Sequence, residues 1–159
     1  LLVEPAERRA AIAGDEAGCI QSGAPVAFVL DQQHAGDGLR TGQGTFIWKN
    51  GDIYVGDWRD DLQNGRGKLT KKNGDVFEGE FKNGLVDGNV VIHYADGRRF
   101  KGAYHKGKRQ GPCIEEDKNG KRFEGTYRND VRDGRFVEKD RNGQVTAKGA
   151  YENGKRFED

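Results

Sequence analysis

The hydrophobic positions of this chain follow a short alternating pattern that returns at a fixed interval. In each copy an aromatic residue, a glycine and a second aromatic residue stand at every other position, and successive copies lie 23 residues apart. The triplets are Tyr54, Gly56 and Trp58; Phe77, Gly79 and Phe81; Phe100, Gly102 and Tyr104; and Phe123, Gly125 and Tyr127. A spacing of two places each triplet on one face of a β-strand, and a fixed repeat of this length predicts a stacked array.

Glycine-containing turns divide each unit into two strands. Asn-Gly or Asp-Gly pairs close one end of every unit, at 50–51, 73–74, 96–97, 119–120 and 142–143. Such pairs supply the positive φ angles that tight hairpins require. We therefore predict an all-β protein: an elongated, single-layer antiparallel sheet of tandem 23-residue hairpins. Full units lie near 54–76, 77–99, 100–122 and 123–146, with partial units at 42–53 and 147–157.

Residues 1–35 do not follow the repeat, so the predicted array covers 36–159. Residues 4–17 are rich in alanine and charge, with Pro5 near their start, which predicts a short helix. The apolar run 25–30 predicts a strand beside the first hairpin. We interpret 1–35 as a helical or irregular cap or linker that covers the sheet edge; the alternative is a segment that docks a partner.

Composition narrows the class of function. Hydrophobic and charged residues each make up 33% of the 159 residues, which suits a thin sheet better than a sandwich with a thick core. The formal net charge of +1 gives no electrostatic footprint for nucleic acid. Cys19, Cys113 and the three histidines show no metal-ligand spacing, and no phosphate-binding loop is present. We expect no catalytic residues, no metal, no cofactor and no enzymatic activity.

Several spaced positions together resemble a known repeat. The pattern Tyr-x-Gly-x-Trp at 54–58, the Gly-x-Gly at Gly65 and Gly67, and the closing Asn-Gly turn resemble the MORN repeat (membrane occupation and recognition nexus) over about residues 36–157. The resemblance implies a twisted, single-layer sheet that serves as a scaffold or a membrane-tethering module. Later units depart from the pattern, because Val90, Cys113 and Phe136 replace the second glycine.

The leading hypothesis is a non-catalytic scaffold that binds a protein or peptide through an aromatic sheet face, because exposed rings make good anchors. The alternative is that these rings only cover the glycines of the sheet. The predicted contact residues are Tyr54, Trp58, Phe77, Phe81, Phe100, Tyr104, Phe123 and Tyr127.

A second hypothesis is a membrane-surface module that binds anionic phospholipid headgroups through the third unit. Residues 100–122 contain seven basic and three acidic residues, and exposed cations attract anionic surfaces. The candidates are Lys101, Lys106, Lys108, Arg109, Lys121 and Arg122. The alternative is a set of solvated side chains.

Two further features leave alternatives open. Glu115 and Glu138 either line an acidic groove or are solvated, and an uncovered last strand at 151–157 predicts a homodimer formed through the sheet edge. Methionine is absent, so we expect an excised or processed chain. Its expected location is the cytoplasm or a membrane surface, or the bacterial envelope if a signal segment has been removed.

Overall fold

The computed structural model describes residues 25–30 and 39–159, and for 25–30 it describes the main chain alone. These residues form one 13-stranded sheet. The strands are β1 (Pro25–Leu30), β2 (Gly42–Trp48), β3 (Ile53–Arg59), β4 (Leu62–Thr70), β5 (Val76–Lys82), β6 (Leu85–His93), β7 (Arg99–His105), β8 (Lys108–Glu116), β9 (Arg122–Arg128), β10 (Val131–Arg132), β11 (Gly134–Lys139), β12 (Val145–Glu152) and β13 (Lys155–Glu158).

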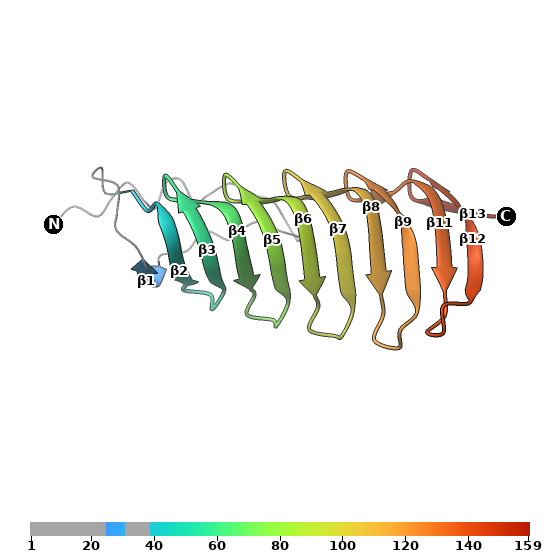
Figure 1. Cartoon of the computed structure of the whole chain (residues 1–159), viewed down its shortest axis with the longest axis horizontal. Coiled ribbons are helices and arrows are strands. Elements are labelled where there is room, and N and C mark those ends of the chain that lie inside the picture. Colours follow the sequence, from blue (N-terminus) through green and yellow to red (C-terminus); the bar gives the residue numbers. More distant parts are fainter. Residues whose placement is uncertain (1–24, 31–38) are drawn as a thin grey trace.

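Strands that follow one another in the sequence lie side by side in the sheet, and every pairing is antiparallel. The short strand β10 pairs with β9 alone, and β11 then continues the order. The result is an elongated meander whose strands succeed one another along the long axis (Figure 1). The predicted fold class is confirmed, and so is the predicted strand at 25–30. The helix predicted over 4–17 lies outside the described residues.

The turns adopt the backbone conformation that their sequences predict. Asn83, Lys106 and Asn153 have φ angles of 50°, 49° and 49°, and each precedes a glycine. Successive turns are also tied together, since the Gly84 N–H donates to the carbonyl oxygen of Gln63 at 3.0 Å. Each hairpin therefore stacks on the one before it through main-chain hydrogen bonds at its turn.

Three of the hairpins bend next to the central glycine of the motif. Between β3 and β4 the register shifts after Gly56, so that Asp57 alone faces the three residues 64–66. The same shift follows Gly79 and Gly102. Four residues of an extended strand span about 13 Å, yet the ring centroids of Tyr54 and Trp58 lie 5.2 Å apart. The strands therefore curl toward the aromatic face.

Candidate binding surfaces

The aromatic residues predicted to contact a partner form the core of the array. All eight are buried, with exposed fractions between 0% for Tyr54 and 7% for Phe123. Tyr54 packs edge-to-face on Trp58 of its own unit and on Phe81 of the next, at centroid distances of 5.2 and 5.1 Å. This burial corrects the expectation of an accessible aromatic surface. Little of each ring surface is therefore left for a partner to contact, although Phe100 and Phe123 border a hollow of about 210 Å³.

The rings also explain the glycines. A Cβ added to Gly67 would overlap the hydroxyl of Tyr54, and one added to Gly125 would overlap the ring of Phe123. The predicted covering of glycine by rings is therefore confirmed. In the unit of Phe100, which lacks a phenol hydroxyl, Cys113 occupies the place of the second glycine and is itself buried. Burial raises the pKa of the Cys113 thiol to about 11.

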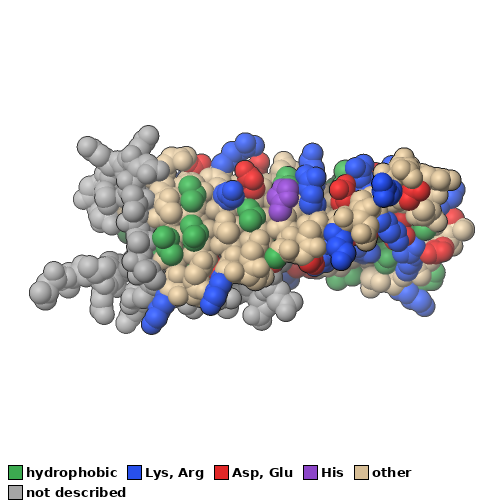
Figure 2. Space-filling model, turned by 90° about the horizontal axis from the view of Figure 1, so that it is seen from below, with side chains coloured by type: hydrophobic (Ala, Val, Ile, Leu, Met, Phe, Trp, Pro, Cys, Tyr) green, Lys and Arg blue, Asp and Glu red, His purple; other side chains and the backbone are tan. Residues whose placement is uncertain are grey.

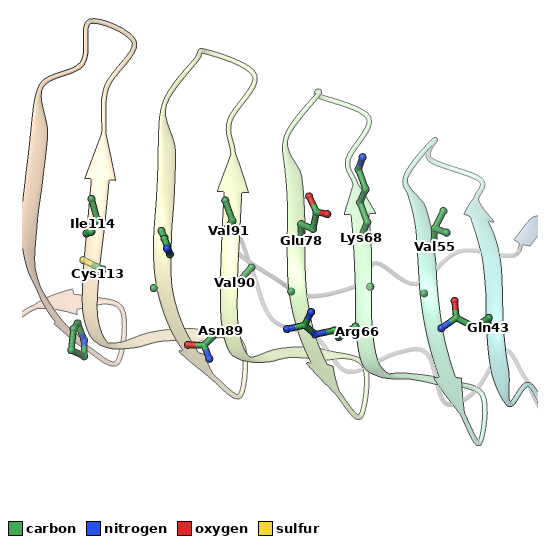
Figure 3. A pocket seen from close by; sticks show the side chains of 16 residues that line it. Gln43, Val55, Arg66, Lys68, Glu78, Asn89, Val90, Val91, Cys113 and Ile114 are labelled. Atoms are coloured by element: carbon green, nitrogen blue, oxygen red, sulfur yellow. The ribbon is translucent and has the colours of Figure 1, made fainter. Parts of the chain in front are cut away.

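The opposite face carries an open groove of about 700 Å³, which we call the outer groove. Side chains from successive strands border it in two rows, which Figure 3 shows across β2 to β8. One row contains Gln43, Arg66, Asn89 and Pro112; the other contains Val55, Lys68, Glu78, Val91, Lys101 and Ile114. Main chain at Gly56, Gly67, Gly79 and Gly102 lines the space between the rows. The outer groove is thus an accessible surface lined by both apolar and charged side chains, and most of the charged side chains are basic.

The model of the MORN repeat family matches residues 37–53, 54–76, 77–97, 100–122 and 123–144, well over half of the chain. The chain belongs to the MORN repeat family. Among solved structures it is similar to the TCP domain of SAS-4 (dCPAP) from Drosophila melanogaster, in complex with a proline-rich motif of Ana2 (dSTIL). That similarity has a TM-score of 0.49 and 16% identity, and covers 82% of this chain and 76% of that one. A search of curated proteins found no match.

A recurring ion pair of the MORN array joins an arginine to an aspartate 21 residues later and was not predicted from the sequence. Arg109 donates to Asp130 at 2.9 Å and its guanidinium lies 4.2 Å from the ring centroid of Tyr127. Arg40 and Asp61 repeat the same arrangement at 2.9 Å, again 21 residues apart. At the intervening units, where the arginine is replaced by Gln63 or Val86, the place of the aspartate is taken by glycine. A recurring Arg–Asp spacing of 21 was the available signal.

The six basic residues predicted to bind an anion are not brought together. Lys106 and Lys108 lie at the turn between β7 and β8, whereas Lys121 and Arg122 lie at the opposite ends of the strands. Lys101 projects from the middle of β7 into the outer groove. Arg109 is half-buried and is paired with Asp130, as described above. Figure 2 shows basic and acidic side chains intermixed over the array. No single basic patch results from the third MORN repeat.

The carboxylates Glu115 and Glu138 are each neutralised by arginine. Arg132 donates to Glu115 at 3.0 Å, and the Tyr127 hydroxyl donates to the same carboxylate at 2.6 Å. Arg156 donates to Glu138 at 2.8 Å, which lowers the pKa of that carboxyl. The described part of the chain contains no group of three or more side chains suited to hold a metal ion. Both carboxylates do line one hollow of about 210 Å³, as the groove hypothesis expected, but Arg109, Lys121 and Arg132 line it too, so the hollow is not purely acidic.

In the described residues we find no helix of sufficient length and apolar character to span a membrane.

Proposed function

We propose that this MORN array is a non-catalytic scaffold that binds an extended, acidic segment of a protein partner in the outer groove. The observation that carries the proposal is the groove itself, because it is the large accessible hollow on the face opposite the buried rings. Its two rows of side chains cross the strands, so a partner would run along the array and contact one hairpin after another.

Charge indicates the chemistry of the partner. Arg66, Lys68 and Lys101 border the groove, against a single carboxylate, Glu78. Within the part of the chain that the structure describes, none of these three cations takes part in an ion pair of 4 Å or less. A segment with two or more Asp or Glu residues would therefore complement the groove, since complementary charge favours association and rejects basic competitors.

The exposed apolar side chains and the length of the groove indicate what kind of segment the partner presents and how long it is. Val55 and Ile114 are 46% and 39% exposed, which leaves apolar surface for a partner to cover. From β2 to β8 the groove crosses six interstrand gaps, or about 29 Å at 4.8 Å each. An extended peptide rises about 3.3 Å per residue, so about nine residues fill this length. The partner segment therefore combines acidic residues with two or three apolar anchors.

A random nonapeptide display library tests this proposal. We expect selection on the wild-type array to enrich peptides rich in Asp and Glu. The variant R66E/K101E should lose that enrichment, whereas K82E, which reverses an exposed charge outside the groove, should retain it. Fluorescence anisotropy of the enriched peptides should give the same order. No enrichment on wild type, or the same enrichment on R66E/K101E, would contradict the proposal.

The membrane-surface alternative gives a different result in a vesicle experiment. Vesicles with 30% phosphatidylserine are compared with neutral vesicles at low and physiological salt. Salt-sensitive binding to the anionic vesicles that is lost in K106E/K108E, together with no peptide enrichment, would replace the scaffold by a lipid-binding module. The separation of the basic residues over two ends of the strands leads us to expect no such binding.

A further inference from the structure

The outer edge of β13 is a second surface with a defined chemistry. β13 stands last in the order of the sheet and, among the described strands, pairs with β12 alone. All four of its residues are exposed, and Phe157 keeps 44% of its surface accessible. An exposed strand edge presents main-chain donors and acceptors that can pair with another strand.

The register of β12 and β13 determines which main-chain groups face outward. The Asp159 N–H donates to the carbonyl oxygen of Lys148 at 3.1 Å. Hydrogen-bonded pairs alternate along an antiparallel ladder, so Lys155 and Phe157 also direct their N–H and C=O groups toward β12. The N–H and C=O groups of Arg156 and Glu158 consequently point away from β12, toward the open edge.

Residues 155–159 read Lys-Arg-Phe-Glu-Asp, with two cations before Phe157 and two anions after it. We propose that this edge pairs antiparallel with the same edge of a second copy, centred on Phe157. Lys155 then faces the partner copy's residue 159, and Arg156 faces its residue 158. Because the arrangement is two-fold symmetric, each opposite-charge pair forms twice.

Only one register satisfies both the main-chain groups and the charges. Outward groups at 156 and 158 allow pairings centred on 156, 157 or 158. Centring on Arg156 places two arginines opposite each other, and centring on Glu158 places two glutamates opposite each other, which is unfavourable. Centring on Phe157 matches every charge with its opposite and brings the two Phe157 rings together. The sequence is therefore self-complementary in one register.

The contact is small, since about five residues from each copy take part. Stable interfaces usually bury well over 1,000 Å², so we expect weak association that needs concentrations of about 100 μM or more. Arg156 already donates to Glu158 of its own strand at 2.8 Å. The second copy extends this pair into a cluster of two arginines and two glutamates on one face of the joined sheets.

A disulfide-trapping experiment tests the register on the full chain in a C19S background, with the oxidant diamide. In F157C the two introduced thiols lie opposite each other in a pair without main-chain hydrogen bonds, where Cα atoms are about 4.5 Å apart. In K155C they are offset by four residues, about 13 Å, beyond the reach of a disulfide. We expect cross-linked dimers from F157C and not from K155C. Equal cross-linking of both variants, or of neither, would overturn the proposal.

Sedimentation velocity over a concentration series provides the second test. Wild type should shift from 17.6 kDa toward twice that mass. E158P removes an outward N–H without removing a hydrogen bond to β12, and K155E places like charges opposite each other, so both should weaken the dimer at least tenfold. K155E/D159K restores opposite charges across the edge but removes the Arg135–Asp159 ion pair of 2.7 Å within each copy, so it should recover the dimer in part. A monomer at all concentrations, species larger than a dimer, or a dimer unaffected by E158P would refute the edge pairing.

Discussion

Replacing Phe100 with alanine tests whether the buried aromatic residues hold the array together. Phe100 is 2% exposed, and its ring packs edge-to-face on Tyr104 at 5.7 Å and on Tyr127 of the next repeat at 6.3 Å. The substitution therefore removes a buried ring and two aromatic contacts, one of which joins neighbouring repeats.

The expected cost follows from these contacts. Burial of a phenylalanine side chain contributes about 1.5–3 kcal/mol, and each aromatic pair adds about 0.5–1.5 kcal/mol. With the cavity that remains, the free energy of unfolding should fall by about 3–5 kcal/mol, as for other Phe→Ala changes in cores.

Urea unfolding followed by circular dichroism and by tryptophan fluorescence measures this loss. Both tryptophans, Trp48 and Trp58, lie in β2 and β3, so they report one end of the array, while circular dichroism reports all strands. Because repeat arrays can unfold in parts, we expect the circular dichroism transition of F100A to shift more than the fluorescence transition.

Phe157→Ala is the matched control, because Phe157 is 44% exposed. At low protein concentration, Phe157→Ala should lower the free energy of unfolding by less than about 1 kcal/mol. If the two substitutions lowered the free energy of unfolding equally, the buried aromatic residues would not be the core of the array. A Phe100→Ala protein that keeps wild-type stability but loses partner binding would restore the aromatic face as a contact surface.

Three other predictions concern single side chains. Tyr127→Phe should lower the free energy of unfolding by about 1–3 kcal/mol, because the Tyr127 hydroxyl contacts a carboxylate and two arginines. Tyr104→Phe should lower it by less than about 0.5 kcal/mol, since the buried Tyr104 hydroxyl finds no hydrogen-bond partner in the described structure. The urea midpoints of the two variants are compared with that of wild type. Gly79→Ala should cost about 1–3 kcal/mol, because its Cβ would overlap a main-chain oxygen of β6; thermal melting detects the loss. The hydrogen bond from Arg156 lowers the pKa of Glu138 below its ordinary 4.5, so its stabilisation is full above that pH and is lost as the pH falls through the lowered value. Urea midpoints of wild type and Glu138→Gln should therefore differ at pH 7, and the difference should shrink progressively as the pH falls below 4.5.

Much of the fold could be predicted because its determinants are local. The alternation around Gly56 defines a strand, and the Asn-Gly at 73–74 defines a turn, within a few residues of sequence. Repetition at 23 residues then leaves sequential hairpins as the simplest arrangement, since neighbouring strands need no long connection. The coverage of glycine by rings followed from the same alternation.

The site was predicted less well because accessibility depends on pairings between strands. Alternation assigns Tyr54 and Val55 to opposite faces, but it does not say which face a bend will enclose. The register shift at Asp57 inserts extra residues on β4, and beside it the rings of Tyr54 and Trp58 lie 5.2 Å apart on the enclosed face. The predicted aromatic surface therefore became the core, and the accessible groove appeared on the other face.

The basic residues show the same division between sequence and structure. Their charge and their membership of one repeat are properties of the sequence. Their separation is a property of the hairpin, because Lys106 and Lys121 stand at opposite ends of strands of up to nine residues, about 30 Å apart at 3.3 Å per residue. The period, the turns and the strand order are thus determined by the sequence alone. The enclosed face, the paired charges and the exposed groove were decided by the bend and the cross-strand register, which bring together residues that local pattern cannot relate.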